Sequence, residues 1–239
     1  MKKLISICIP VYEMGGYGIE MFKVLMESIK IQTYKNIQIV VSDHSKDKIF
    51  EEVCQEYNLN IKYVKFEEKY GNGPANTNNA LKNSDGEIIK PIFQDDFLID
   101  FRAIEKMVAC LENSNGHGWL ACGCLHTDTE GKRLERPHIP MWGGMGEDNS
   151  INSYTRIEQK IGCPSIIMFK ADSSLEFDDN LVMLMDYGFY YRLGKLYGSP
   201  IILQEYLVAS SNWSGSVTSR TGYGNNENEK QYMRDNYDK

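Results

Sequence analysis

Two adjacent carboxylates, Asp95 and Asp96, follow directly after an apolar run rich in β-branched residues. The run at 87–93 has the composition of a buried strand, and carboxylates at the tip of such a strand are costly unless a cation meets them. In open α/β sheets ligands bind outside the carboxyl ends of the strands, so a divalent metal ion that carries a phosphate fits this position. The pair can also begin a turn or cap a helix, because aspartate is common in both places.

The end of the first apolar run offers a second candidate site, formed by Pro10, Val11, Tyr12 and Glu13. Three glycines follow within the next five residues and allow the backbone to approach a ligand closely. Their spacing is not the Gly-x-Gly-x-x-Gly fingerprint of dinucleotide-binding proteins. A plain turn before a helix explains the same residues, so both interpretations remain open.

Two further polar stretches lie next to expected strands. Asp43 ends an apolar run and is followed closely by Ser45; the carboxylate can accept a hydrogen bond from the N–H of a base, and the hydroxyl can bind nearby groups. The same residues can cap the helix that begins near Asp47. The stretch 71–79 opens a helix and ends at Asn79; its amides can hold sugar hydroxyls or simply form a turn.

Asp186 enters a helical segment rich in tyrosine and is followed six residues later by Arg192. A lone carboxylate at the start of a helix is usually a partner of the helix dipole or a cap. The residue pattern alone therefore does not assign Asp186 a catalytic role.

Short β-rich runs alternate with helical patterns over the first hundred residues. Strands are expected at 4–11, 37–42, 61–66 and 87–93, and helical spacing of apolar residues fills the gaps. Strands separated by helices need crossover connections, which favour a parallel sheet with helices on both faces. The expected fold class is therefore α/β, with a single Rossmann-like, mostly parallel central sheet.

The alternation weakens in the second half of the chain. We expect helices at 104–111 and 187–197, and strands at 119–126, 166–170 and 201–208. The Gly- and Pro-rich segment 129–149 predicts a long loop, and the polar residues 225–239 predict a mobile tail. We expect one domain at 1–209, with a nucleotide-binding half at 1–100 and an acceptor and catalytic half at 101–209, followed by a polar lid or tail at 210–239.

Composition excludes several classes of function. The chain has 239 residues, a formal net charge of −7 and no cluster of Lys and Arg, which argues against a nucleic-acid-binding surface. No stretch approaches the roughly 20 apolar residues that span a bilayer, so at most peripheral membrane contact is expected. The six cysteines lie mostly in apolar segments, as in a reduced, cytoplasmic protein. Cys122, Cys124 and His126 lack the second ligand pair of a usual zinc finger.

Several motifs occur together in the order and rough spacing of family 2 glycosyltransferases with the GT-A fold. They are Ile5 to Tyr12, Gln32-Thr33-Tyr34, Val40 to Ser45, Gly73 to Asn79 and Phe93-Gln94-Asp95-Asp96, with further similarity at 162–170 and 186–192. The chain therefore resembles this family. The resemblance implies an inverting enzyme that binds a nucleotide-sugar donor across the strand tips, with Mn²⁺ or Mg²⁺ on the acidic motif.

The resemblance also assigns roles to single positions. Asp95 corresponds to the metal ligand, Asp43 to the carboxylate that binds the base, and Asp186 to the general base that deprotonates the acceptor hydroxyl. The residues implied to bind the nucleotide or donor are Pro10, Val11, Tyr12, Glu13, Asp43, Ser45, Asn79, Gln94, Asp95 and Asp96. The segment from Trp213 to Thr218 is a candidate flexible lid over the donor.

Three positions depart from the family pattern. Phe93 replaces the first aspartate of the common Asp-x-Asp, His44 stands within the motif that usually reads Asp-Asp-Gly-Ser, and Asn78 stands where an arginine is frequent. These changes concern contacts with the ribose and the pyrophosphate.

The expected function is transfer of a sugar from a nucleoside diphosphate donor, with uridine favoured by family habit, to a carbohydrate or lipid-linked acceptor. The process implied is surface polysaccharide assembly, in the cytoplasm or at the inner face of the membrane. A non-catalytic nucleotide-sugar or carbohydrate-binding protein is an alternative that would not need Asp186 as a base. A nucleotidyltransferase is a second alternative, but residues 10–18 hold no Lys or Arg for a basic phosphate loop.

Overall fold

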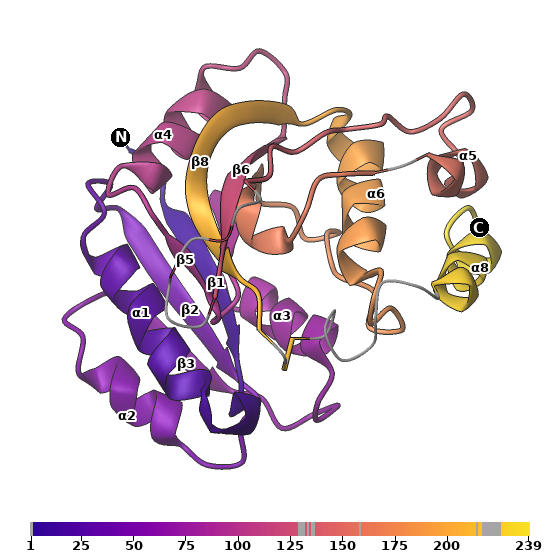
Figure 1. Ribbon diagram of the computed structural model, residues 1–239. Helices are drawn as coiled ribbons and strands as arrows, with labels where there is room; N and C mark the ends of the chain where they lie inside the picture. The colour runs from indigo at the N-terminus through magenta and orange to yellow at the C-terminus, as the bar shows by residue number, and fades with distance from the viewer. Residues whose placement is uncertain are drawn as a thin grey trace.

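The computed structural model describes residues 2–128, 132, 134, 137–157, 159–213, 215, 216 and 226–239. Among these residues, eight strands form one central sheet in the order β3-β2-β1-β4-β7-β6-β8-β5, with helices packed around it (Figure 1). Four of the seven strand pairings are parallel. The predicted α/β class with a mostly parallel sheet is therefore confirmed.

The first part of the chain builds the parallel side of the sheet. Its elements are β1 (Ile5–Val11), α1 (Gly18–Lys30), β2 (Ile37–Asp43), α2 (Ile49–Gln55), β3 (Ile61–Lys65), α3 (Gly73–Lys82) and β4 (Ile88–Pro91). A short 3-10 helix, η1 (Met14–Gly16), follows β1. Strand β1 pairs in parallel with β2 and β4, and β2 with β3. Crossover helices return the chain to the same edge each time, so the carboxyl ends of these strands lie together.

The second part adds antiparallel strands and more helices. Its elements are β5 (Asp96–Leu98), α4 (Ala103–Glu112), β6 (Trp119–Thr127), α5 (Ile151–Arg156), η2 (Pro164–Ile166), β7 (Ile167–Lys170), α6 (Met185–Tyr197), β8 (Ile201–Ser211) and α8 (Glu227–Asn236). Strand β7 runs antiparallel between β4 and β6, and β8 lies between β6 and β5. Strand β8 continues past residue 209, where a domain boundary was expected.

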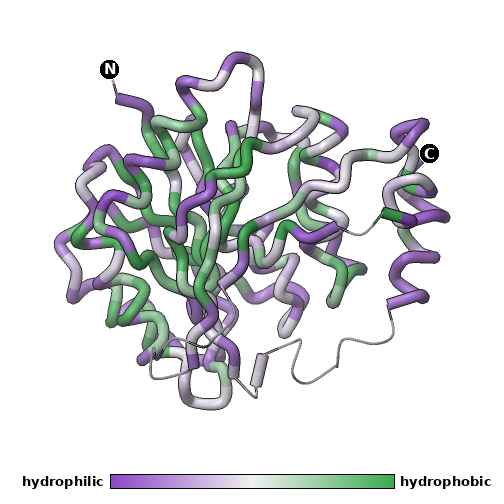
Figure 2. The backbone as a smooth tube through the Cα atoms, turned by 45° about the horizontal axis from the view of Figure 1, so that its top comes forward, coloured by the Kyte–Doolittle hydropathy of each residue, from purple (hydrophilic) through white to green (hydrophobic). Residues whose placement is uncertain are grey.

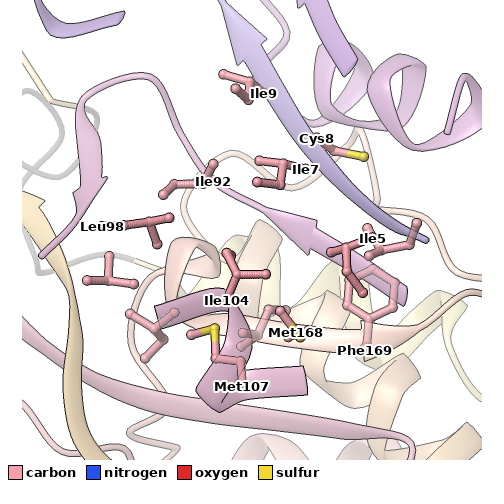
Figure 3. Close-up of a cluster of buried hydrophobic side chains, with 14 of the residues drawn as sticks. Ile5, Ile7, Cys8, Ile9, Ile92, Leu98, Ile104, Met107, Met168 and Phe169 are labelled. Carbon is pink, nitrogen blue, oxygen red and sulfur yellow. The ribbon is translucent and has the colours of Figure 1, made fainter. Parts of the chain in front are cut away.

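The main core lies on both faces of the sheet. All seven residues of β1 are buried, which requires cover on each side of that strand. On one face, side chains of β1, β5, α4 and β7 meet, including Ile7, Leu98, Ile104 and Met168 (Figure 3). Burying each such side chain stabilises the fold by about 1.5 to 3 kcal/mol, so this cluster helps to hold β1 in its place in the sheet.

A second, smaller cluster joins the helices α5, α6 and α8. It contains Ile151, Tyr154, Leu184, Tyr191 and Met233, all of them buried. This helical layer lies beside the sheet, on the side where α6 packs (Figure 1).

The expectation of a mobile tail at 225–239 is wrong for residues 226–239. Helix α8 is mostly hydrophilic (Figure 2), but it buries Met233 completely against the second cluster. A helix with a single buried apolar residue shows no periodic pattern in the sequence, because its place is set by the surface that receives it. Residues 214 and 217–225, which include three of the six residues of the expected lid at 213–218, lie outside the described part of the chain.

The described part of the predicted loop 129–149 contains no helix, and the Trp142 ring anchors it. Trp142 packs edge-on against Trp119, with 5.3 Å between ring centroids, and lies 6.0 Å from Tyr154. Within the described ranges, no helix combines the length and apolar character that crossing a bilayer requires.

Candidate functional site

The loop after β1 is shaped by the side chain of Gln94. Its amide oxygen accepts the backbone N–H of Tyr12 at 2.6 Å, and its amide nitrogen donates to the carbonyl oxygens of Tyr12 (3.0 Å) and Gly18 (3.1 Å). A Cβ atom at Gly18 would lie only 2.3 Å from the carbonyl oxygen of Tyr12, so glycine is required there. Pro10 and Val11 are buried in β1, whereas Tyr12 is exposed. Gln94 thus positions the loop, and its direct contact with a donor stays a prediction.

Glu13 joins three loops at the carboxyl edge of the sheet. Its carboxylate accepts the backbone N–H of Lys46 at 2.5 Å and the hydroxyl of Tyr70 at 3.2 Å. The His44 ring packs against two aromatic rings, with its centroid 5.0 Å from that of Phe66 and 5.4 Å from that of Tyr70. Tyr70 is 56% exposed, so this edge presents an aromatic face to a planar ligand such as a base. The sequence pattern did not single out Tyr70.

The Asp43 carboxylate at the end of β2 is fully buried and accepts four hydrogen bonds. One oxygen accepts the N–H (2.7 Å) and the hydroxyl (2.5 Å) of Ser45, and the other accepts the Tyr63 hydroxyl (2.6 Å) and the Lys65 ammonium (3.3 Å). Since a carboxylate has about four lone-pair sites, a base can reach Asp43 only by replacing one of these donors. Its contact with a base stays a prediction. Tyr63 and Lys65 alternate along β3, and this period of two could have pointed to them.

Asparagines of α3 tie the ends of β1 and β2 together. Asn76 accepts the Ser42 hydroxyl at 2.6 Å and donates to the carbonyl oxygen of Val11 at 3.1 Å. Asn79, the predicted site residue, donates to the Ser42 hydroxyl oxygen at 2.8 Å. Asn76 therefore lies nearer the strand tips than Asn79, whose contact with a donor stays a prediction.

Asp95 and Asp96 lie where the chain passes from β4 into β5. Asp96 is 4% exposed and accepts hydrogen bonds from the Ser211 N–H (3.1 Å) and the Ser165 side chain. Asp95 is half-buried and accepts the indole N–H of Trp213 at 3.1 Å. Burial raises the pKa of both carboxyls, most strongly that of Asp96. Among the described residues no Lys or Arg forms an ion pair with either carboxyl, and the positive charge that acts on Asp96 comes from the buried Lys90.

A divalent cation fits Asp95 at a site where a bound diphosphate supplies further ligands. Mg²⁺ and Mn²⁺ prefer oxygen ligands, and Mg²⁺ is commonly held by one or two carboxylates together with substrate phosphates. Within the described ranges, no three His, Cys, Asp or Glu side chains are grouped so that they could hold a metal ion by themselves. Asp95 therefore suits an ion that arrives with a diphosphate, rather than one held by the protein alone.

A buried lysine, Lys90, is connected to Asp96 of the acidic pair through Ser165. Lys90 of β4 has no exposed surface, and its ammonium donates to the carbonyl oxygens of Pro91 (3.0 Å) and Ser165. Burial lowers the pKa of Lys90 to about 8. Ser165 thus connects Lys90, through its carbonyl group, with Asp96, through its hydroxyl group.

Asp186 lies in the first turn of α6, as predicted, and burial raises the pKa of its carboxyl to about 6. One oxygen accepts the N–H of Tyr187 at 2.7 Å, and the other accepts no hydrogen bond from another residue that the structure describes. Arg192 lies on the same helix but pairs with Asp178 (3.5 Å) and donates to the carbonyl oxygen of Glu176 (2.7 Å). Asp186 is therefore free to accept a proton, whereas Arg192 holds the segment before α6.

Tyr190 attaches the Asp186 face of α6 to the segment that precedes β7. It lies four residues after Asp186, hence on the same face of the helix. Its hydroxyl donates to the carbonyl oxygen of Gly162 at 2.7 Å, three residues before Ser165, which contacts Asp96. The segment 162–165 thus contacts both the helix that carries Asp186 and the acidic residue Asp96.

Comparison with known proteins decides the family. Residues 6–176, well over half of the chain, match the family described as Glycosyl transferase family 2. The chain belongs to glycosyltransferase family 2. An uncharacterized glycosyltransferase of Rickettsia bellii is 29% identical over 209 residues, which cover 84% of this chain and 29% of that protein. Glycosyltransferase GlyG of Streptococcus pneumoniae is 29% identical over 100 residues, 41% of this chain and 32% of GlyG. The chain thus spans about a third or less of these relatives.

Solved structures show the same fold. S. aureus TarS 1-349 in complex with UDP-GlcNAc superposes with a TM-score of 0.69 at 19% identity, covering 97% of this chain and 64% of that one. The mannosyltransferase PcManGT from Pyrobaculum calidifontis, in complex with GDP-Man and Mn²⁺, gives a TM-score of 0.62 at 16% identity, covering 89% and 57%. This family 2 chain therefore has the GT-A fold that the sequence motifs implied.

Proposed function

We propose that this family 2 chain is the catalytic domain of an inverting glycosyltransferase, which moves a sugar from a nucleoside diphosphate donor to a hydroxyl of a carbohydrate or glycolipid acceptor. The observation that carries the proposal is the pair Asp95 and Asp96. These carboxylates are desolvated at the carboxyl edge of the sheet and form no ion pair with a Lys or Arg that the structure describes. A cation that accompanies an anionic diphosphate adds positive charge next to these two carboxylates.

The donor is proposed to lie over the loop after β1, with its base near Glu13, Asp43 and the exposed Tyr70. The two solved relatives described above hold UDP-GlcNAc and GDP-Man, which supports a nucleotide sugar as the donor class. Uridine is our preferred base, on family habit and on the TarS complex. Pro10, Val11, Tyr12, Ser45, Asn79 and Gln94 are proposed to line or support this donor site.

Asp95 is the proposed ligand of Mn²⁺ or Mg²⁺. When bound, such an ion stabilises the negative charge that develops on the departing diphosphate. Asp96 is proposed to hold the neighbouring Asp95 in position, because the Asp96 carboxylate is itself held by hydrogen bonds from Ser211 and Ser165. The presence of Mn²⁺ in the PcManGT complex supports a divalent cation.

Asp186 is the proposed general base. A base that works near neutral pH needs a pKa close to that pH, and desolvation raises the pKa of the half-buried Asp186 carboxyl to about 6. In a single displacement, Asp186 takes the proton of the acceptor hydroxyl as the oxygen attacks the anomeric carbon and the bond to the diphosphate breaks. This raised pKa favours catalysis over the alternative of a non-catalytic nucleotide-sugar-binding protein. The acceptor is proposed to be a surface polysaccharide or its lipid-linked precursor, at the cytoplasmic side of a membrane.

The test begins with calorimetric binding of UDP, dTDP, GDP and CDP, each with and without Mn²⁺. We expect one nucleotide to bind only with the metal, and the Asp95→Ala variant to lose that binding. Asp172→Ala, which changes an exposed carboxylate on a turn, is the matched control and should bind normally. Turnover is then followed as release of the nucleoside diphosphate from sugar donors of the selected base.

The Asp186→Asn variant separates catalysis from binding. It should retain metal-dependent nucleotide binding and lose turnover by about a hundredfold or more, since general base catalysis contributes about 10² to 10⁴ in rate. Normal turnover in this variant would refute the base assignment. Absence of nucleotide binding in a folded wild-type protein would refute the donor site.

A further inference from the structure

Helix α8 reaches across to the start of α6 through Glu229. One carboxylate oxygen of Glu229 lies 3.2 Å from the N–H of both Val182 and Met183, and the other lies 3.1 Å from the N–H of Met183 and 2.8 Å from that of Leu184. These three residues directly precede α6, where backbone N–H groups have no partner within the helix. A carboxylate at this end is also favoured by the helix dipole. Glu229 thus fixes the backbone that leads into the first turn of α6.

Helix α8 is attached to the same layer at further points. Met233 is fully buried against the second cluster. Tyr232 accepts a hydrogen bond from the side-chain amide of Asn180 at 2.8 Å, and Asp238 accepts the Tyr191 hydroxyl of α6 at 2.6 Å. The position of Glu229 is therefore set by the docking of the whole helix, and α8 lies alongside the layer that contains α6 (Figure 1).

The residue that these contacts place is Asp186, two positions after Leu184. The ionisable groups near its carboxyl are Tyr187 and Tyr190 of α6, Tyr154 of α5 and Glu229 of α8. No Lys or Arg of the described residues is among them. Glu229 therefore acts on Asp186 in two ways, through the backbone that it holds and through its negative charge, which disfavours loss of the Asp186 proton.

We propose that Glu229 is a positioning residue for sugar transfer: by holding the N–H groups of residues 182–184, it aims the Asp186 carboxylate at the acceptor hydroxyl and makes α8 part of the catalytic apparatus. The proposal rests on the base role of Asp186 given above. A displacement of about 1 Å in a reacting group can lower a rate about a hundredfold, so a contact that fixes one helical turn has a measurable effect on turnover. Glu229 itself touches neither donor nor acceptor in this assignment.

The test compares Glu229→Gln and Glu229→Ala with Glu227→Gln. The control removes a carboxylate from the same helix, where Glu227 is exposed and pairs with Lys230 and Arg234. Glutamine keeps one acceptor oxygen of Glu229 and removes its charge, so it is the milder change and preserves folding. Turnover is followed as nucleoside diphosphate release from the donor selected above, and hydrogen exchange reports protection of the amides at 182–184.

We expect kcat to fall about tenfold in Glu229→Gln and up to about a hundredfold in Glu229→Ala, with KM for the donor and metal-dependent nucleotide binding unchanged. The acid limb of the kcat profile should move to lower pH in Glu229→Gln, because a negative charge near Asp186 is lost. Amide protection at 182–184 should fall in both Glu229 variants and stay unchanged in Glu227→Gln.

Two results would overturn the proposal. The first is a Glu229→Gln enzyme with the kcat and pH profile of Glu227→Gln. The second is an equal loss of kcat and of nucleotide affinity, which indicates a general loss of structure. Failure of the underlying base assignment is seen separately, as normal turnover in Asp186→Asn.

Discussion

Replacing Asn78 by alanine should destabilise the protein strongly, because this side chain joins the parallel part of the sheet to the segment before α6. Its amide nitrogen donates to the carbonyl oxygen of Phe177 at 2.8 Å, and its amide oxygen accepts the N–H of Phe177 at 2.7 Å. Asn78 is 7% exposed and Phe177 is 1% exposed, so water does not reach these groups freely. Alanine leaves both backbone groups of Phe177 buried and unpaired.

The expected loss follows from those two groups. An unsatisfied buried donor or acceptor costs about 1 to 3 kcal/mol, so Asn78→Ala should lower the free energy of unfolding by about 2 to 5 kcal/mol. This is a large part of the roughly 5 to 15 kcal/mol that stabilises a typical domain. The Phe177 ring also stacks on Phe189 of α6, with 4.0 Å between centroids, so the effect should extend to the helix that carries Asp186.

Urea unfolding followed by circular dichroism measures this change. Asn58→Ala is the control, because Asn58 is exposed and should alter the free energy of unfolding by less than about 0.5 kcal/mol. A loss below about 1 kcal/mol in Asn78→Ala, with an unchanged denaturant slope, would refute the reasoning, since it would mean that the backbone of Phe177 finds other partners.

Three further outcomes are expected. Binding of the nucleotide with Mn²⁺ should alter tryptophan fluorescence, because the Trp213 indole donates a hydrogen bond to Asp95, the candidate metal ligand. The Trp213→Phe variant should lose that response. The wild-type kcat should fall as the pH drops through about 6, since the Asp186 carboxyl, with its pKa raised to about 6, must be deprotonated to act as a base; a kcat that stays flat down to pH 5 would contradict this role. Gly18→Ala should weaken nucleotide binding about tenfold or more, because its Cβ would lie 2.3 Å from the carbonyl oxygen of Tyr12. Gly73→Ala is the control and should bind as the wild type does, because open space surrounds the position of its Cβ. Equal binding by both variants would exclude the loop after β1 from the donor site.

Much of the fold could be predicted because its signals are local. The apolar runs of β1, β2, β3 and β4 differ from the observed strands by one or two residues at their ends. Helical spacing marked α1 and α2 between these strands and α4 after them. Helix α8 was missed because it buries only Met233 and is otherwise polar. Strand β5 was missed because three residues are too few to show alternation.

The candidate site was predicted in part. Asp95 and Asp96 stand out as charge at the end of an apolar run, and Asp186 lies at the start of its predicted helix. Gln94 and Asp43 are predicted to contact the donor, and in the structure Gln94 holds the loop after β1 while Asp43 is held by Ser45 and by two residues of β3. The loop contact of Gln94 could not be read from the pattern, because a polar side chain at a strand end can face a ligand or a neighbouring loop with the same local sequence.

The sequence by itself determined where strands and helices form and which polar groups come at their ends, because periodicity, glycine and charge act over a few residues. Only the tertiary structure decided which groups meet. Asp95 contacts Trp213, 118 residues away in the chain, and Glu229 holds Leu184, 45 residues away. Such pairs depend on crossover connections and on the docking of α8, and the burial that shifts the pKa of Asp186 arises only when these layers pack together.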